Sequence, residues 1–312
     1  MTMKGAKIIG IVTAVIVVLV LLVTVFLFKG KENNNERIKI VASFYPVYTA
    51  VQRVTQGVEG VEVVSLAPSQ TGCLHDYQLT PDNMISLKQA DALIINGAGA
   101  ESFLGNIDEN HPDLNVLDTS KGIELIEDDH SHQHEEGDHE AEEYNQHIWT
   151  SPTNYIKQIE NIRDGLIRID PDYADEYKEN AQKYIGQIKD IRSELLKAVD
   201  TLFTKKCFIF HGSLEYFAKD LGLEPILYLS LGEGAGVSAA DLANASRLAG
   251  NAGKILLIYD DQYDTEYNSV AKDAELSRII KIDTAVTRSN TDTDAWINAM
   301  MRNLDEIKKA AA

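Results

Sequence analysis

Histidine, a common metal ligand, is concentrated in one stretch of this chain. Five of the eight histidines in its 312 residues fall within DDHSHQHEEGDHEAEEYNQHIWTSP, residues 128–152. Neutral imidazole binds zinc, copper, nickel and iron, and the interleaved carboxylates add negative charge. The first half of the stretch has no apolar periodicity and cannot bury enough surface to offset the entropy of ordering it. We predict that residues 127–143 form a mobile, low-affinity metal-collecting loop, and its histidines are His130, His132, His134 and His139. The alternative is a solvated acidic linker in which histidine is incidental.

The remaining candidate ligands are dispersed along the chain. His147 ends the histidine-rich stretch beside two apolar residues, so we expect it to be held in the folded structure. His75 lies in a loop after a predicted strand, and His211 and Asp283 lie directly at the ends of predicted strands. Ligands of open α/β sheets bind at the carboxyl ends of the strands. Three imidazoles and one carboxylate can form a tetrahedral zinc shell, although such dispersed spacing is weak evidence by itself.

Each of these residues also has a purely structural interpretation. His75 can be an exposed residue of a polar loop, and His211 can hydrogen-bond its neighbours at a strand end. Asp283 can cap a turn. Three other carboxylates compete for the fourth ligand position, and they are Asp260, Asp261 and Asp264.

Cysteine usage and net charge limit the classes of function. The two cysteines, Cys73 and Cys207, form no CxxC pair, which excludes a cysteine-based zinc knuckle. Both lie close in sequence to candidate histidines, but the simpler interpretation of each is a small buried apolar residue. The formal net charge of -19 disfavours binding to nucleic acid or anionic lipid and attracts cations.

The N-terminal region predicts a membrane anchor. Residues 8–28 read IIGIVTAVIVVLVLLVTVFLF, an uncharged apolar stretch long enough to span a hydrocarbon core of about 30 Å. No small-residue cleavage site follows it, and no cysteine stands where a lipoprotein would be acylated. We predict an uncleaved anchor over residues 1–29, with a cleaved signal as the alternative, and a flexible linker over residues 30–37. The rest of the chain would then lie on the extracellular face.

The elements that position the candidate ligands alternate between strand and helix. This alternation predicts an α/β fold of two lobes, each a mainly parallel sheet of about four strands flanked by helices. Residues 38–169 are predicted to form the N-terminal lobe and residues 204–312 the C-terminal lobe. Helical periodicity from Asp170 predicts a linking helix over residues 170–203, roughly 45 Å long and rigid. The expected strands are residues 38–42, 61–66, 92–95, 114–118, 207–210, 225–229, 254–260 and 278–283. The expected helices are residues 49–55, 82–89, a short one from 151, 213–221, 238–251 and 294–310.

Several segments carry a family resemblance, in a kept order from residue 38 to the C-terminus. They are SFYPVY, HDYQLTP, ADALIINGAGAE, NQHIWTSP, FHGSLEYFAKDLGL and the late IDT. Together they resemble the metal-specific solute-binding proteins of bacterial ABC transporters, the cluster A-I group that takes up zinc or manganese. The family pattern D-P-H-x-W-x-x-P corresponds to NQHIWTSP. A histidine-rich loop before the second ligand is typical of the zinc-uptake branch.

The resemblance implies a function as well as a fold. It makes His75, His147 and His211 metal ligands and Asp283 the fourth, and three nitrogen donors favour zinc over manganese. We expect a monomer that captures extracellular zinc and delivers it to an ABC permease without catalysis, with lobes that move little on binding. A manganese or iron importer component, or a surface adhesin of the same fold, is the alternative. A membrane-anchored zinc hydrolase is a weaker one, because the sequence has neither HExxH nor G-x-S-x-G.

The chain also departs from the family pattern. Asn145 and Gln146 replace the usual D-P before the second histidine, and Gly212 replaces the usual aspartate after the third. Asp260 or Asp261 stands where a glutamate commonly ends the seventh strand, and a lipobox cysteine is missing. These departures leave open how the ligands are oriented and how the protein is anchored.

Overall fold

The computed structural model describes the chain from residue 38 onward with several gaps. The described residues are 38–69, 71, 74, 77–105, 107, 111–127, 144–229, 237–263, 267–276, 278–286 and 292–312. The predicted anchor, the linker and nearly all of the predicted metal-collecting loop lie outside them. So do the following residues singled out above: His75, Cys73, His130, His132, His134, His139 and Asp264. Within the described part of the chain, no helix has the length and apolar character to cross a membrane.

Two four-stranded parallel sheets form the centre of Ile38–Ala312, which is one compact unit. The N-terminal sheet has the order β2-β1-β3-β4, and its strands are β1 (Ile38–Ala42), β2 (Val61–Ser65), β3 (Ala92–Ile95) and β4 (Asn115–Asp118). The C-terminal sheet has the order β6-β5-β7-β8, and its strands are β5 (Lys206–Phe210), β6 (Glu224–Leu229), β7 (Leu256–Asp260) and β8 (Ile279–Ile282). The same order therefore occurs twice along the chain. The predicted pair of parallel sheets is confirmed.

Alternate residues of the central strands face two different cores. Cys207 and Ile209 of β5 pack into the large core that also contains residues of the long helices, whereas Phe208 and Phe210 pack against α8 and α9. A strand buried on both faces appears in sequence as a continuous apolar run, which is why CFIF was recognisable. Burial raises the pKa of the Cys207 thiol to about 12, so this cysteine is an apolar core residue.

The helices mostly agree with expectation, and they are α2 (Tyr45–Val54), α3 (Pro81–Lys88), α5 (Pro152–Ile169), α6 (Ala174–Asp200), α7 (Glu215–Leu221), α8 (Ala239–Ala252), α9 (Tyr267–Asp273) and α10 (Ala295–Ala311). Ser238 caps α8, because its Oγ accepts the Asp241 N–H at 3.1 Å. The start predicted for α2 is wrong, because Pro46 lies in the first turn, where a missing N–H costs nothing. The helix after Ser151 was predicted too short, and α9 was not predicted.

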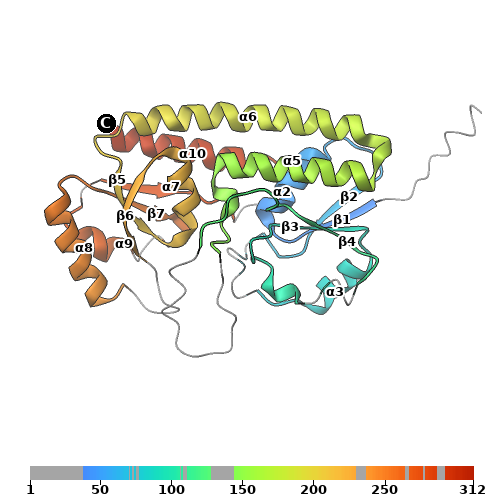
Figure 1. Ribbon diagram of the computed structural model, residues 1–312, viewed down its shortest axis with the longest axis horizontal. Helices are drawn as coiled ribbons and strands as arrows, with labels where there is room; N and C mark the ends of the chain where they lie inside the picture. Colours follow the sequence, from blue (N-terminus) through green and yellow to red (C-terminus); the bar gives the residue numbers. More distant parts are fainter. Residues whose placement is uncertain are drawn as a thin grey trace, which may run out of the picture. The chain divides into compact units, whose positions relative to one another are not determined.

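Helix α6 passes both sheets, as Figure 1 shows. Its buried residues Tyr177, Tyr184 and Leu195 belong to the same core as Ile40 of β1 and Ile209 of β5. The helix begins at Ala174, after a 3-10 turn at Pro171–Tyr173, and has 27 residues. A helix packed on both halves through one continuous core resists their relative motion.

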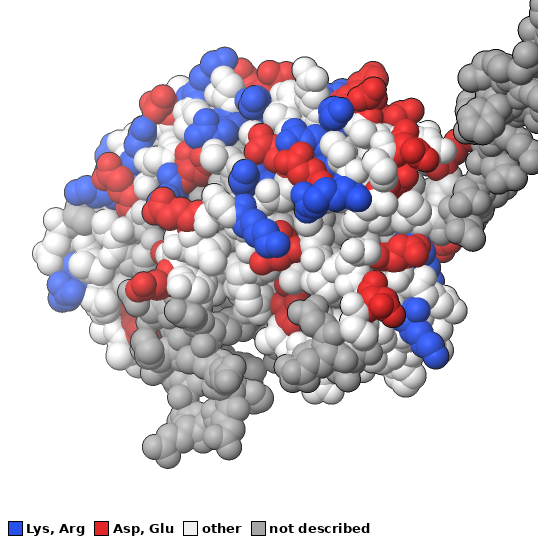
Figure 2. Space-filling model, turned by 45° about the vertical axis from the view of Figure 1, so that its right-hand side comes forward, with Lys and Arg blue, Asp and Glu red and all other residues white. Residues whose placement is uncertain are grey.

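Charged side chains are intermixed on the surface drawn in Figure 2, where acidic and basic groups lie among one another over the helices. On that face the described residues do not segregate by sign. The net charge of -19 therefore does not appear there as a single acidic patch.

Candidate metal centre

The carboxyl ends of the C-terminal strands bring two candidate ligands and a buried acid to one edge. His211 directly follows β5, Asp283 directly follows β8, and Asp260 is the last residue of β7. Because β5, β7 and β8 are neighbouring parallel strands, their carboxyl ends meet at the same edge of the sheet. The strand-end positions inferred from sequence for His211 and Asp283 are correct.

His147 reaches this edge through the turn that contains Trp149. It precedes the 3-10 turn Ile148–Thr150 and is only 5% exposed. The Trp149 ring packs edge-on against Phe44, just after β1, with centroids 4.9 Å apart. The Trp149 indole N–H donates to Thr284 O, just after β8, at 2.9 Å. Trp149 therefore fixes the His147 turn against the strand ends of both sheets.

His147 and His211 lie close enough to share one ion. Their ring centroids are 5.6 Å apart and the planes cross at 81°. Two imidazoles on one tetrahedral zinc, with Zn–N near 2.0–2.1 Å, have centroids roughly 5 Å apart. The donor chemistry and spacing of this pair thus fit a zinc ion. Whether His75 joins them is outside the described residues.

Asn145 fixes the proton position on the His147 ring. Its Oδ1 accepts the His147 backbone N–H at 3.0 Å, and its Nδ2 donates to Gly212 O at 2.9 Å, which settles the orientation of the amide. His147 Nδ1 lies 2.9 Å from the same Oδ1, so Nδ1 carries the proton. This tautomer places the lone pair on Nε2, as metal binding through that nitrogen requires.

His211 has the opposite tautomer and a strained backbone. The Ser213 N–H donates to His211 Nδ1 at 3.3 Å, which places the ring proton on Nε2. Zinc binding through Nε2 would move that proton to Nδ1, so the Ser213 contact must then be released. The φ angle of His211 is 81°, in a region that favours glycine. Such strain is concentrated at functional sites.

Asp260 supports the turn after His211. Its carboxylate is 0% exposed and accepts the Ser213 hydroxyl at 2.6 Å. Further donors are Gln262 N–H at 3.0 Å and the Thr284 hydroxyl at 3.3 Å. Burial raises the pKa of Asp260, and these hydrogen bonds partly offset that effect. Asp260 thus joins the turns after β5 and β8.

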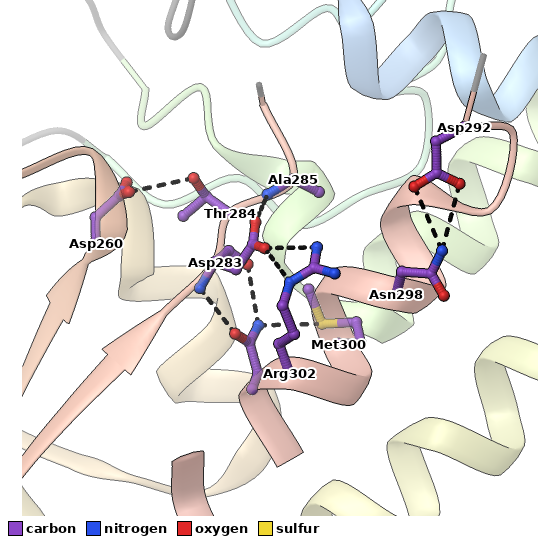
Figure 3. A network of polar contacts seen from close by, with 9 residues as sticks. Asp260, Asp283, Thr284, Ala285, Asp292, Asn298, Met300 and Arg302 are labelled. Carbon is purple, nitrogen blue, oxygen red and sulfur yellow. Dashed lines mark hydrogen bonds and ion pairs between the residues drawn. The ribbon is translucent and has the colours of Figure 1, made fainter. Parts of the chain in front are cut away.

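Asp283 is 5% exposed and engaged by Arg302 of α10. Its Oδ2 accepts Arg302 Nε–H at 2.8 Å and lies 2.7 Å from Arg302 Nη2, while its Oδ1 accepts the Ala285 N–H at 2.9 Å (Figure 3). Among the described residues, no three His, Cys, Asp or Glu side chains are grouped to hold a metal. The structure brings His147 and His211 together, and Asp283 as a ligand stays a prediction.

Sequence reasoning left the role of Asn145 open and missed three residues at this site: Ser213, Arg302 and Trp149 as the connector of the two sheets. Asn145 had a usable signal, because it replaces an acidic residue two positions before a candidate ligand. Arg302 had none, because only the tertiary fold brings α10 to the end of β8.

The fold and site define a class before any comparison is made. Two parallel sheets of the same strand order, a long helix packed on both, and two histidine rings in contact beside the strand ends describe a solute-binding protein for metal ions. The sequence matches the family model described as "Zinc-uptake complex component A periplasmic" over residues 40–310. The chain belongs to this family.

Individual relatives have low sequence identity to this chain, but their similarity extends over most of it. The chain is 26% identical over 299 residues to the zinc-binding lipoprotein AdcA of Streptococcus pneumoniae (strain ATCC BAA-255 / R6), covering 90% of this chain and 57% of that protein. It is 24% identical over 290 residues to the high-affinity zinc uptake system protein ZnuA of Bacillus subtilis (strain 168), covering 89% and 88%. A crystal structure of ZnuA has the same fold, with a TM-score of 0.68 at 22% identity over 88% of this chain and 98% of that one. The chain thus spans little more than half the length of its AdcA relative.

Proposed function

We propose that the chain captures extracellular zinc and delivers it to an ABC permease in the membrane. The ion would be held by His75, His147, His211 and Asp283, without catalysis. The relatives AdcA and ZnuA, whose names state zinc binding or zinc uptake, support this function. Membership of the zinc-uptake family supports the permease as partner.

One observation carries the proposal. His147 lies just before α5 and His211 directly follows β5, and their ring centroids are 5.6 Å apart. The His147 ring is already in the tautomer that binds metal through Nε2, because Asn145 Oδ1 accepts its Nδ1–H. Such an arrangement lowers the cost of ordering a ligand when the ion arrives.

The nitrogen donors of the three proposed histidine ligands favour zinc over manganese. Imidazole nitrogens suit zinc, whereas manganese prefers carboxylate, carbonyl and water oxygens. With three histidines as donors, zinc should bind more tightly than manganese. Replacing His211 by Glu should narrow this difference, because it exchanges a nitrogen donor for an oxygen donor.

The metal-collecting loop and the membrane anchor complete the proposal. Residues 127–143 would bind further zinc ions weakly through His130, His132, His134 and His139. Residues 8–28 would anchor the protein with its binding site on the extracellular face. We expect it to act as a monomer.

Zinc stoichiometry and affinity test the proposal. The full chain and a variant lacking residues 129–142 are titrated with zinc against a chromophoric chelator. One tight site that survives the deletion, together with weak sites that vanish, is the expected result. Loss of all tight binding in the deletion variant would place the site in the loop and overturn the assignment of His147 and His211.

A further inference from the structure

Asp283 is held more firmly than a lone carboxylate at a strand end. Asn303 of α10 accepts the Asp283 backbone N–H through Oδ1 at 2.7 Å, and Asn303 Nδ2 donates to Asp283 O at 3.0 Å. The Ala285 N–H donates to Asp283 Oδ1 at 2.9 Å. These contacts fix both the backbone of Asp283 and the direction of its side chain.

Arg302 occupies one oxygen of this carboxylate. Arg302 Nε–H donates to Asp283 Oδ2 at 2.8 Å, and Nη2 of the same guanidinium lies 2.7 Å from that oxygen (Figure 3). A carboxylate oxygen has two lone-pair sites, so two charged donors fill Oδ2. The side chain of Asp283 is 7% exposed and that of Arg302 is 47% exposed. If the Arg302 guanidinium is displaced, little water can therefore reach Asp283 to replace its hydrogen bonds.

This geometry limits how Asp283 can bind a metal. A metal that takes both carboxylate oxygens must first displace Arg302 from Oδ2. Zinc in a site of three imidazoles needs one oxygen to complete a tetrahedron. Manganese favours six oxygen-rich ligands and gains more from a second carboxylate oxygen. The free-energy cost of displacing Arg302 therefore lowers the affinity for manganese more than the affinity for zinc.

We propose that Arg302 is a specificity-determining residue that prevents Asp283 from binding metal through both oxygens and so favours zinc over manganese. The inference rests on the proposed function, because it requires a metal bound near Asp283. It assigns to α10 a role in metal selection, through a side chain that does not itself bind the ion.

Metal affinities of Arg302 variants test this role. Zinc and manganese dissociation constants are measured by chelator competition on the full chain, for wild type and Arg302→Gln. Lys308→Gln is the matched control, because Lys308 is an exposed cation on the same helix. Losing one positive charge affects two divalent ions alike, so the ratio of the two constants reports ligand geometry and not charge.

The expected result is a shift of the manganese-to-zinc affinity ratio toward manganese by roughly tenfold in Arg302→Gln and no shift in Lys308→Gln. The shift should vanish when Asp283→Asn is added, since the effect acts through that carboxylate. Arg302→Lys keeps the positive charge but loses the paired N–H donors of the guanidinium, so it should also shift the ratio. This variant replaces Arg302→Gln in the test if Arg302→Gln does not fold.

The outcomes separate the two proposals. If wild type binds zinc tightly but the ratio is unchanged in the Arg302 variants, the role of Arg302 is overturned and the proposed function stands. The same holds if a structure of the zinc-loaded protein shows both Asp283 oxygens on the metal and Arg302 displaced. If wild type binds no zinc tightly, both proposals fail.

Discussion

Asn145 Oδ1 lies 2.9 Å from His147 Nδ1, and the amide nitrogen of the same Asn145 lies 3.0 Å from Glu215 Oε2. One side chain therefore orients a candidate ligand and also joins it to the first residue of α7. An aspartate, usual in the family at this position, could orient the ring but could not donate to Glu215. The amide at position 145 is therefore complementary to Glu215, because only an amide can orient His147 and also donate a hydrogen bond to the Glu215 carboxylate.

Asn145→Asp should weaken zinc binding by roughly tenfold, because it sets two carboxylates against each other and moves the His147 turn. Glu215→Gln in the same chain should restore most of the affinity, since the new amide can donate to the carboxylate. Zinc affinity of both single variants and the double variant measures the coupling. Glu215→Gln alone should change little, because its amide oxygen still accepts from Asn145. Equal losses in the single Asn145→Asp variant and the double variant would contradict the pairing.

His211→Gly should be more stable without metal than His211→Ala, by about 1–3 kcal/mol. The φ angle of 81° at this position suits glycine, whereas alanine keeps the strain and loses the ring. Urea unfolding of the two metal-free variants measures the difference. Both variants should lose the stabilisation that zinc gives to wild type, and equal stability of the two would show that the backbone is unstrained.

Glu101 should make the protein less stable as pH rises. Burial raises the pKa of Glu101 from 4.5 to about 7. Hydrogen bonds from the Asn96 and Gly97 N–H groups lower this pKa, and the charge of Asp118 raises it further. Its contribution is complete below pH 4.5 and is lost as pH rises through 7, a loss of about 3 kcal/mol. Urea unfolding at pH 5 and pH 8 should show a smaller change in Glu101→Gln than in wild type.

Glu179→Gln is the control for this comparison, because Glu179 is an exposed acid on α6. It should keep the wild-type dependence of stability on pH. A dependence in Glu101→Gln as large as that of wild type would assign the effect to other groups.

Asp220→Asn should destabilise the protein by about 2–4 kcal/mol at neutral pH. Burial alone would raise the pKa of Asp220, but hydrogen bonds from Arg192, Thr153 and Ser151 outweigh it and the pKa is lowered. These contacts join α7 to the start of α5 and to α6. The stabilisation is present above the ordinary pKa of 3.8 and is lost as pH falls through the lower folded-state pKa.

The difference between wild type and Asp220→Asn should therefore shrink when thermal unfolding is measured at progressively more acidic pH. Asp175→Asn, which removes an exposed acid paired with Lys178, should change stability by less than about 0.5 kcal/mol. A difference for Asp220→Asn that does not depend on pH would mean that shape, and not charge, matters at this position.

The fold was predictable because its signals are local. Buried parallel strands such as CFIF and ALII are continuous apolar runs, and Ser238 with Asp241 marks a helix start. The ends of such strands share one edge, which located His211 and Asp283 before their surroundings were known. Helix α2 begins four residues before the expected start at residue 49, because proline at position 46 fits the first turn of a helix.

By itself the sequence determined where the strands and helices lie along the chain, which histidines are candidate ligands, and the resemblance to metal-binding relatives. Only the tertiary structure decided the distance between the His147 and His211 rings, the tautomer of each, and the pairing of Asp283 with Arg302. The physical reason is range: strand and helix patterns depend on neighbours a few residues away. Proton positions and ion pairs depend on groups that are brought together from distant parts of the chain only when the protein folds.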